Sequence, residues 1–181
     1  PEEIYGLNIL GNFYRSFELA EKYGASFIQI DSVCGHLKPD PDEEYESALK
    51  LLRSNSDCTV LGGVRFKYQP VKSGRTLAED LKIGTGRCDA IVCTGEGTGL
   101  ATPMEKVEKF KQILGDFPVI IGAGVAIDMI EACRKNSDGL IVGSWFKDNH
   151  RAEYSVNEEY VKDFMLRWNA HPSTTPLTNS L

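Results

Sequence analysis

The sequence lacks long apolar runs and an excess of basic residues. A membrane-spanning helix needs roughly 18 or more consecutive apolar residues, and no run in the chain approaches that length. Lys and Arg number 20 against 26 Asp and Glu, which gives a net charge of -6. Binding to nucleic acid or to anionic lipid without sequence specificity requires a basic surface. The composition therefore predicts a protein without a transmembrane segment and without a nucleic-acid partner.

The sequence also lacks a secretory signal and an even set of cysteines. Its first residues, PEEIYGLNIL, contain neither a basic stretch nor a small-residue cleavage site. The cysteines are odd in number, scattered and set among apolar residues, which is typical of reduced core thiols in a reducing compartment. We therefore expect a cytoplasmic location and no disulfide framework. The five cysteines are Cys34, Cys58, Cys88, Cys93 and Cys133.

Length and composition indicate one globular domain. The chain has 181 residues, of which 41% are hydrophobic and 25% charged, fractions close to those of ordinary soluble domains. The segment after Asn169 is rich in Ser, Thr and Pro and poor in apolar residues. We expect a barrel domain over 1–169 and a loose tail over 170–181.

Short apolar runs alternate with helical patterns along the chain. The runs are nearly continuous in apolar residues, which is typical of a parallel sheet covered on both faces. Strand followed by helix, repeated six times, predicts βαβ units in a doubly wound sheet or a (β/α) barrel. Strands are expected over 4–10, 27–33, 59–66, 89–95, 118–125 and 138–146, with helices over 13–23, 43–53, 76–83, 103–114, 126–134 and from the cap Asn157 to Trp168.

Two helix starts carry specific signals. Thr102 is a natural N-cap, with Pro103 at the first helical position and Glu105 placed to close a capping box. The acidic run over 39–46 suits the first turn of a helix, where the helix dipole favours negative charge. We expect that run to be solvated rather than catalytic.

Glycines end the fifth and sixth runs. In both candidate architectures the ligand lies at the carboxyl ends of the strands. Gly122 and Gly124 end the fifth run, and Gly143 and Ser144 end the sixth. Backbone amides at these glycines can approach an anion closely and Ser144 adds a hydroxyl, so the pattern predicts a phosphate site. The alternative is that the glycines only serve the turns.

This glycine pair also suggests which strands are present. Many barrels build their phosphate site after strands seven and eight, which would make these six strands the last six of eight. A complete (β/α) barrel has about 250 residues, and the missing initiator Met agrees with the absence of two units. The first and last strands would then expose open edges. We expect an N-terminal segment of a longer protein, or a second copy in a homo-oligomer, to cover them.

Three polar residues are the predicted catalytic groups. Lys67 follows the third run and could bind phosphate, form a Schiff base or act as a general acid; the alternative is a solvated surface lysine. Asp31 ends the second run and could be a general base or only cap a turn. Asn8 lies near the end of the first run and could hydrogen-bond substrate hydroxyls.

The loop after the fourth run is rich in Gly and Thr. Thr94, Gly95 and Thr98 could bring donors to a substrate, although turn chemistry alone would explain the composition. Asn12 is a further substrate candidate and could instead cap the next helix.

The sequence gives little support for a metal site or a nucleotide-binding site. Cys34 and His36 have no second Cys/His pair nearby, so we expect no metal site. His150 and Arg151 follow the sixth run and are expected at the surface. No P-loop or GxGxxG motif is present, so we expect no nucleotide cofactor.

Five segments together resemble the BtpA family, which includes a photosystem I biogenesis protein and SgcQ-like proteins. They are GLNILGN, ASFIQIDSV, DAIVCTGEGTG, PVIIGAGV and SDGLIVGSWFKDN, in this order between residues 4 and 168. The resemblance implies a ribulose-phosphate-binding type of barrel, a phosphorylated small-molecule site and the absence of the first two βα units. Lys67 matches the family, whereas Gly63, Arg65 and Tyr68 stand where the family tends to carry an acidic residue and histidines.

The sequence and the resemblance together predict a barrel that binds a small phosphorylated metabolite. The expected chemistry is that of a sugar-phosphate or nucleoside-type isomerase, lyase or hydrolase. The alternative is a non-catalytic assembly or regulatory factor on the same scaffold.

Overall fold

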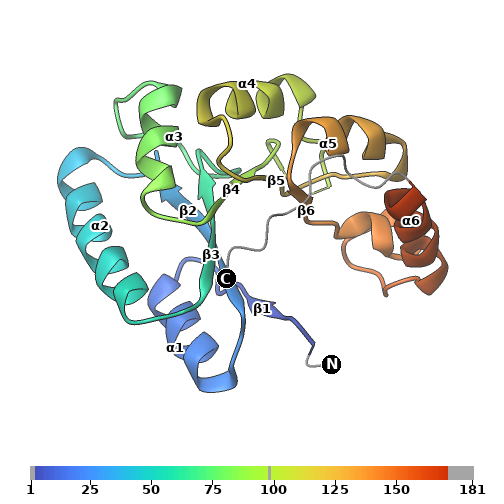
Figure 1. Cartoon of the computed structure of the whole chain (residues 1–181), viewed down its shortest axis with the longest axis horizontal. Helices are drawn as coiled ribbons and strands as arrows, with labels where there is room; N and C mark the ends of the chain where they lie inside the picture. Colours follow the sequence, from blue (N-terminus) through green and yellow to red (C-terminus); the bar gives the residue numbers. More distant parts are fainter. Residues whose placement is uncertain (1–2, 98, 171–181) are drawn as a thin grey trace.

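The computed structural model describes residues 3–97 and 99–170. Its core is a single parallel sheet in which the strands follow one another in chain order, β1-β2-β3-β4-β5-β6. The sheet curls, and its helices follow the curl in a row (Figure 1). The strands are β1 (Gly6–Leu7), β2 (Phe27–Cys34), β3 (Thr59–Val64), β4 (Ala90–Cys93), β5 (Val119–Ile121) and β6 (Gly139–Leu140).

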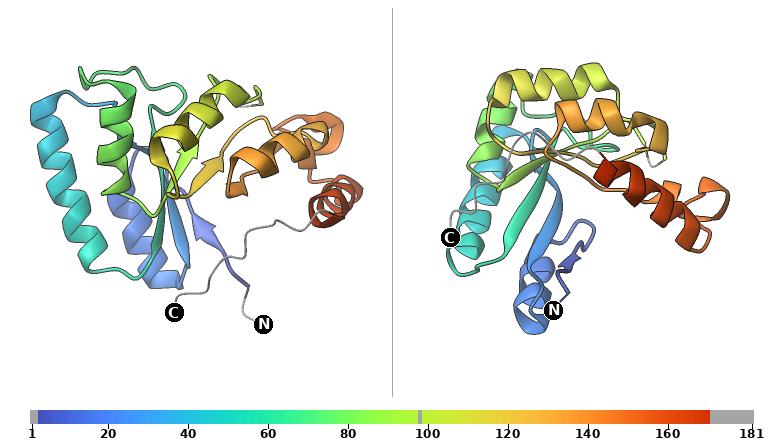
Figure 2. Two further views of the ribbon diagram at one scale, coloured as in Figure 1. Left: turned by 45° about the horizontal axis from the view of Figure 1, so that its top comes forward. Right: turned by 45° about the vertical axis from the view of Figure 1, so that its right-hand side comes forward.

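The connecting helices are amphipathic and lie on the outer side of the curl. From two other directions, α6 lies at the far end of the row from α1 and α2 (Figure 2). The helices are α1 (Phe13–Tyr23), α2 (Pro39–Ser54), α3 (Leu77–Thr85), α4 (Met104–Leu114), α5 (Ile130–Asn136) and α6 (Glu158–Ala170), with 3-10 turns η1 (Ile127–Met129), η2 (Ser144–Phe146) and η3 (Asp148–His150).

The hydrophobic core lies between the sheet and these helices. Ile28 of β2 and Ile91 of β4 are fully buried and belong to the same apolar cluster as Phe110 of α4. In β2, however, burial alternates from Phe27 to Ser32, and Asp31 is only half-buried. An alternating strand has one face on the core and the other less covered. The expectation that both faces are covered is therefore wrong for β2, because six units do not close around the inner face.

The predicted fold class is confirmed, with shifted boundaries. The structure is an incomplete (β/α) barrel of six parallel units, and helix α1 has the predicted bounds. The first and sixth strands are far shorter than predicted, two residues each, and the chain after β6 turns into η2. Helix α2 begins at Pro39, four residues before the predicted start, since Pro suits the first turn of a helix. The segment predicted as one helix over 126–134 is split between η1 and α5.

The ends of the chain bear on three further expectations. The predicted tail falls mostly on 171–181, outside the described residues. Asn157 accepts hydrogen bonds from the amides of Glu159 and Tyr160, so the predicted cap of α6 is confirmed. Within the described residues, no helix has the length and apolar character that crossing a membrane requires.

Candidate functional site

The loops after β4 and β5 meet at the carboxyl ends of the strands. The buried hydroxyl of Thr102 donates to the Ala123 carbonyl at 2.9 Å, which joins the two loops. Thr102 therefore does not cap α4: Pro103 occupies the cap position, without a side-chain hydrogen bond. The predicted capping box is wrong because this hydroxyl is used for a contact between loops that are distant in sequence.

Gly124 has a packing reason to be glycine. Its φ is +62°, and an added Cβ would lie 2.1 Å from the Leu100 carbonyl oxygen. A side chain there would strain the backbone and push the loop after β4 away. Gly122 is equally tight, because its Cβ would lie 2.4 Å from a Val92 methyl. Substituting either glycine would therefore disturb the fold as well as any bound anion.

Gly143 and Ser144 complete the predicted phosphate site. A Cβ on Gly143 would meet no atom within 4 Å, so packing does not require glycine here. The loop after β4 also reaches this place, since a Cβ on Gly99 would lie 3.8 Å from Ser144 Oγ. The amides of Gly124, Gly143 and Ser144 donate to no other backbone group among the described residues. The four predicted phosphate-binding residues thus belong to loops at one edge of the sheet.

Asn8 and Asp31, two of the three predicted catalytic residues, are in contact with each other. The Asn8 amide Nδ2 donates to Asp31 Oδ1 at 3.1 Å, across the neighbouring strands β1 and β2. Both side chains are accessible, Asn8 more than Asp31. The pair can accept and donate hydrogen bonds to a ligand at the inner side of the sheet.

Lys67 lines a pocket between the loops after β3 and β4. The lysine lies three residues beyond the end of β3, not at the strand end as predicted. Its amide donates to the buried Thr94 hydroxyl at 3.0 Å. The Thr94 carbonyl in turn accepts from Lys106 Nζ at 2.6 Å. Thr94 therefore holds Lys67 through its hydroxyl and Lys106 through its carbonyl.

The pocket has a volume of about 460 Å³ and combines charged side chains with apolar surface. Asn8 and Asp31 do not belong to its lining in the described part of the chain, so the predicted catalytic residues fall into two places. Its lining residues are Arg65, Phe66, Lys67, Tyr68, Gln69, Pro70, Gly95, Glu96 and Lys106.

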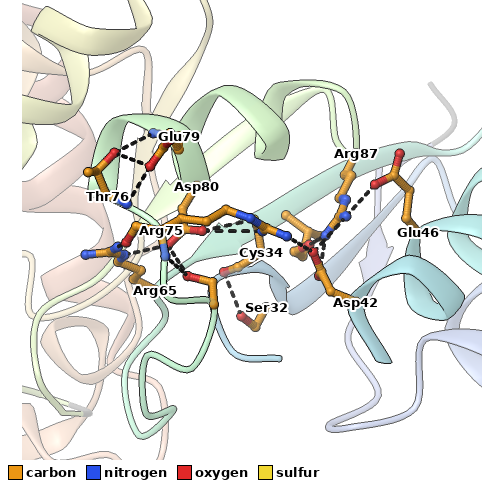
Figure 3. A network of polar contacts seen from close by, with 12 residues as sticks. Ser32, Cys34, Asp42, Glu46, Arg65, Arg75, Thr76, Glu79, Asp80 and Arg87 are labelled. Carbon is orange, nitrogen blue, oxygen red and sulfur yellow. Dashed lines mark hydrogen bonds and ion pairs between the residues drawn. The ribbon is translucent and has the colours of Figure 1, made fainter. Parts of the chain in front are cut away.

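A buried ion-pair network holds the loop that carries Lys67 (Figure 3). Asp80, in the first turn of α3, accepts from Arg65 Nε at 2.8 Å and from the Ser73 hydroxyl at 3.0 Å. Asp42, in the first turn of α2, accepts from Arg75 at 2.7 Å and from Arg87 at 2.7 Å. The network therefore fixes the loop after β3 at both ends.

The electrostatics of the network follow from burial and from the arginines. Burial alone would raise the pKa of Asp42, but hydrogen bonds from Arg87 and Arg75 outweigh it and hold that pKa below its usual value. Burial, reinforced by the Asp80 charge, raises the pKa of the Cys34 thiol to about 11. Asp42 is thus ionised at neutral pH and Cys34 is protonated, which suits a structural cluster.

Asp42 corrects the expectation for the acidic run. We expected the carboxylates of 39–46 to be solvated, yet Asp42 is 1% exposed and paired with two arginines. Its neighbour Asp40 is exposed as predicted. Asp42 is buried, unlike its neighbours in the run, because its position in the turn faces the loop after β3.

The remaining candidates have local roles or fall outside the description. Asn12 accepts from the Arg15 amide and caps α1, the alternative role foreseen for it. Thr98 lies outside the described residues. Cys34 contacts Asp80 within the network, and His36 packs edge-on against the Tyr45 ring.

His150 and Arg151 are exposed, as the sequence suggested. The His150 ring stacks on Trp145 at 3.9 Å between centroids, and Arg151 pairs with Glu153. Both residues therefore have partners in their own loop.

Sequence reasoning missed Lys106 and the arginine network. A signal for Lys106 exists: it is a cation in the first turn of a helix, next to the positive end of the dipole. No local pattern marks the network, because its members come from separate segments of the chain.

The fold and the carboxyl edge of the sheet define a class of protein, namely an incomplete (β/α) barrel whose polar residues gather at the carboxyl ends of its strands. The family model of the BtpA family matches residues 4–170. The chain belongs to the BtpA family, and the predicted membership is confirmed.

Archaeal relatives of this chain are longer than it is. An uncharacterized protein of Thermococcus kodakarensis is 32% identical over 162 residues, which cover 85% of this chain and 60% of that protein. An uncharacterized protein of Methanocaldococcus jannaschii is 27% identical over 164 residues, 87% of this chain and 62% of that protein. The chain thus spans about 60% of the length of the curated relatives it matches.

Solved structures support the barrel fold. Phosphoribosyl anthranilate isomerase from Thermococcus kodakaraensis superposes with a TM-score of 0.58 at 19% identity, covering 94% of this chain and 76% of that one. An archaeal fructose 1,6-bisphosphate aldolase gives 0.57 at 14% identity, covering 85% and 62%. At these identities the likeness shows the fold alone.

Proposed function

We propose that the protein binds a small phosphorylated metabolite at the carboxyl edge of its sheet. The observation that carries this proposal is the gathering of Gly124, Gly143 and Ser144 beside the loop after β4, with amides that donate to no other described backbone group. Such amides stabilise an anion without a large net positive charge. The names of the two structural neighbours, an isomerase and an aldolase, both refer to phosphorylated compounds.

The chemistry proposed for this site is that of a sugar-phosphate isomerase, lyase or hydrolase. A phosphate held by the glycine loops anchors the substrate away from the reacting atoms, and its binding energy orients the rest of the molecule. Lys67, in its pocket, then acts on a carbonyl or leaving oxygen. Asp31, held by Asn8 outside that pocket, takes up a proton only from a substrate that extends from the pocket toward β1 and β2.

Calorimetry with inorganic phosphate tests the anchor. Gly143→Ala places a methyl group where nothing else packs, and Ser144→Ala removes the hydroxyl. Ser144→Ala should weaken phosphate binding by about tenfold or more, since hydrogen bonds to charged groups contribute about 1.5–3 kcal/mol. Gly143→Ala keeps its amide and should weaken binding because the added methyl obstructs the approach of the anion. Gly86→Ala is the control, because Gly86 lies before β4 at the opposite edge and its Cβ would make an ordinary contact at 3.5 Å. Equal phosphate affinity in all four proteins would refute the site.

A second candidate, a non-catalytic assembly factor, is favoured by exposed apolar residues around the first βα unit. Ile4 is 81% and Leu10 78% exposed, and Tyr14 of α1 is also exposed. Such residues around an open strand edge attract a partner, whether another protein or a second copy. Light scattering separates the candidates: a monomer that binds phosphate favours the enzyme, whereas an oligomer that does not bind phosphate favours the scaffold.

A further inference from the structure

Lys106 lies at an electrostatically unfavourable position in its helix. It occupies the first turn of α4, where a positive charge lies next to the positive end of the helix dipole. Its side chain turns back to the Thr94 carbonyl and lies 5.7 Å from the Phe110 ring centroid. The described contacts of the ammonium are thus a neutral carbonyl and an aromatic face, neither of which supplies a compensating negative charge.

Lys106 shares its pocket with further cations. Three basic side chains line it, Arg65, Lys67 and Lys106, against one acidic side chain, the exposed Glu96. Asp80 pairs with Arg65, whereas the described contacts of the Lys106 ammonium include no carboxylate. Thr94 fixes the backbone of Lys67 through its hydroxyl and the ammonium of Lys106 through its carbonyl, so the Lys106 charge is positioned before any ligand arrives.

We infer that the ligand carries a second anionic group, and that Lys106 binds it. This inference rests on the proposed function, in which the first anionic group is a phosphate at the glycine loops. Lys106 is then a specificity-determining residue, because it separates ligands with two anionic groups from those with one. Lys67 lies at the same end and faces the atoms next to the second anion.

The strand order fixes the approximate length of this ligand. The pocket lies at the ends of β3 and β4, and the glycine loops at the ends of β5 and β6. Two steps between neighbouring strands, at about 4.8 Å each, separate the two places by roughly 10 Å. A pentose or hexose chain spans such a distance when it carries phosphate at one end and a second phosphate or a carboxylate at the other.

The test compares ligands that differ by one anionic group. Fructose 1,6-bisphosphate is measured against fructose 6-phosphate, and 6-phosphogluconate against glucose 6-phosphate, by calorimetry at fixed salt. At least one pair should show binding about tenfold or more tighter for the doubly charged ligand, and which pair does so identifies the second group as phosphate or carboxylate. Lys106→Met should abolish this gain, and Lys106→Arg should retain part of it.

Lys109→Met is the matched control, since Lys109 is exposed on the same helix, lies outside the pocket lining and changes the net charge equally. It should leave the gain intact. Inorganic phosphate is titrated in parallel into each variant. If phosphate binds but neither doubly charged ligand gains affinity, or if Lys106→Met and Lys109→Met weaken the gain alike, the inference is wrong and the proposed function stands. If phosphate does not bind, the proposed function fails and the inference fails with it.

Discussion

Replacing Asp42 by Asn removes the central negative charge of the buried network and almost none of its volume. Arg87 donates to the Asp42 carboxylate at 2.7 and 3.2 Å, and Arg75 donates to it at 2.7 Å. The carboxylate is nearly inaccessible to solvent, as is the Arg87 guanidinium. The variant therefore leaves a buried guanidinium with only Glu46, an exposed residue, as its charged partner.

The expected cost follows from that uncompensated charge. Removing one partner of a buried ion pair costs about 3–5 kcal/mol, and the Glu46 contact places this case at about 3 kcal/mol. Since a domain of ordinary stability unfolds with about 5–15 kcal/mol, the loss is a large share of the total. It corresponds to a melting temperature lower by about 6–12 °C for a chain of this size.

Urea denaturation followed by circular dichroism measures the difference, with Asp40→Asn as the control. Asp40 lies in the same first turn of α2 and is exposed, so both variants lose the same favourable interaction with the helix dipole, about 0.3–1 kcal/mol. Asp42→Asn should lower the urea midpoint well beyond the control, with an unchanged slope. If both variants unfold at the same urea concentration, the network does not stabilise the fold and the argument is refuted.

Two further predictions concern pH and Thr94. The arginines lower the pKa of Asp42 in the folded state, so the stability that Asp42 contributes is present above about pH 4, its unfolded pKa, and is lost as the pH falls through the folded pKa. The urea concentration at the unfolding midpoint should therefore drop below about pH 4. It should drop less steeply in Asp42→Asn. Thr94→Val leaves the Lys67 amide without the acceptor it has at 3.0 Å, so the free energy of unfolding should fall by about 1–3 kcal/mol. The affinity for fructose 1,6-bisphosphate should also fall, while the affinity for inorganic phosphate stays the same. Unchanged affinity for the bisphosphate would contradict the role given to Thr94.

The sequence predicts the order of elements well, because that order depends on local periodicity. The helix over 13–23 is found with those bounds, since Asn12 caps it and Gly24 ends it in a left-handed conformation. The strands are predicted too long where an apolar run continues past the last ladder hydrogen bond. The run over 138–146 is mostly apolar, yet only Gly139–Leu140 pairs with β5, and Trp145 and Phe146 pack in a 3-10 turn.

The sequence predicts less of the site, because its geometry depends on contacts between loops. Asn8 and Asp31 are in contact because Asn8 follows β1 directly and Asp31 lies within the neighbouring parallel strand β2, which continues to Cys34 and does not end at Asp31 as predicted. Thr102 has the sequence signature of a cap, but a partner 21 residues away takes its hydroxyl. Lys106 likewise depends on a contact between segments, because its position is set by a hydrogen bond to the carbonyl of Thr94 on the preceding loop.

The two ends of the carboxyl edge are held in place by different forces, and this difference suits different tasks. The loops after β4 and β5 fit backbone against backbone at Leu100 and Gly124, with no ionised group in that contact. The loop after β3 is held by arginines on Asp42 and Asp80, so its position depends on charge. A phosphate common to many metabolites requires a constant, rigid cradle, whereas selection among metabolites requires residues that differ from one protein to the next. The tightly packed end therefore agrees with the anchor that we propose, and the end carrying Lys67 and Lys106 agrees with the proposed choice of substrate.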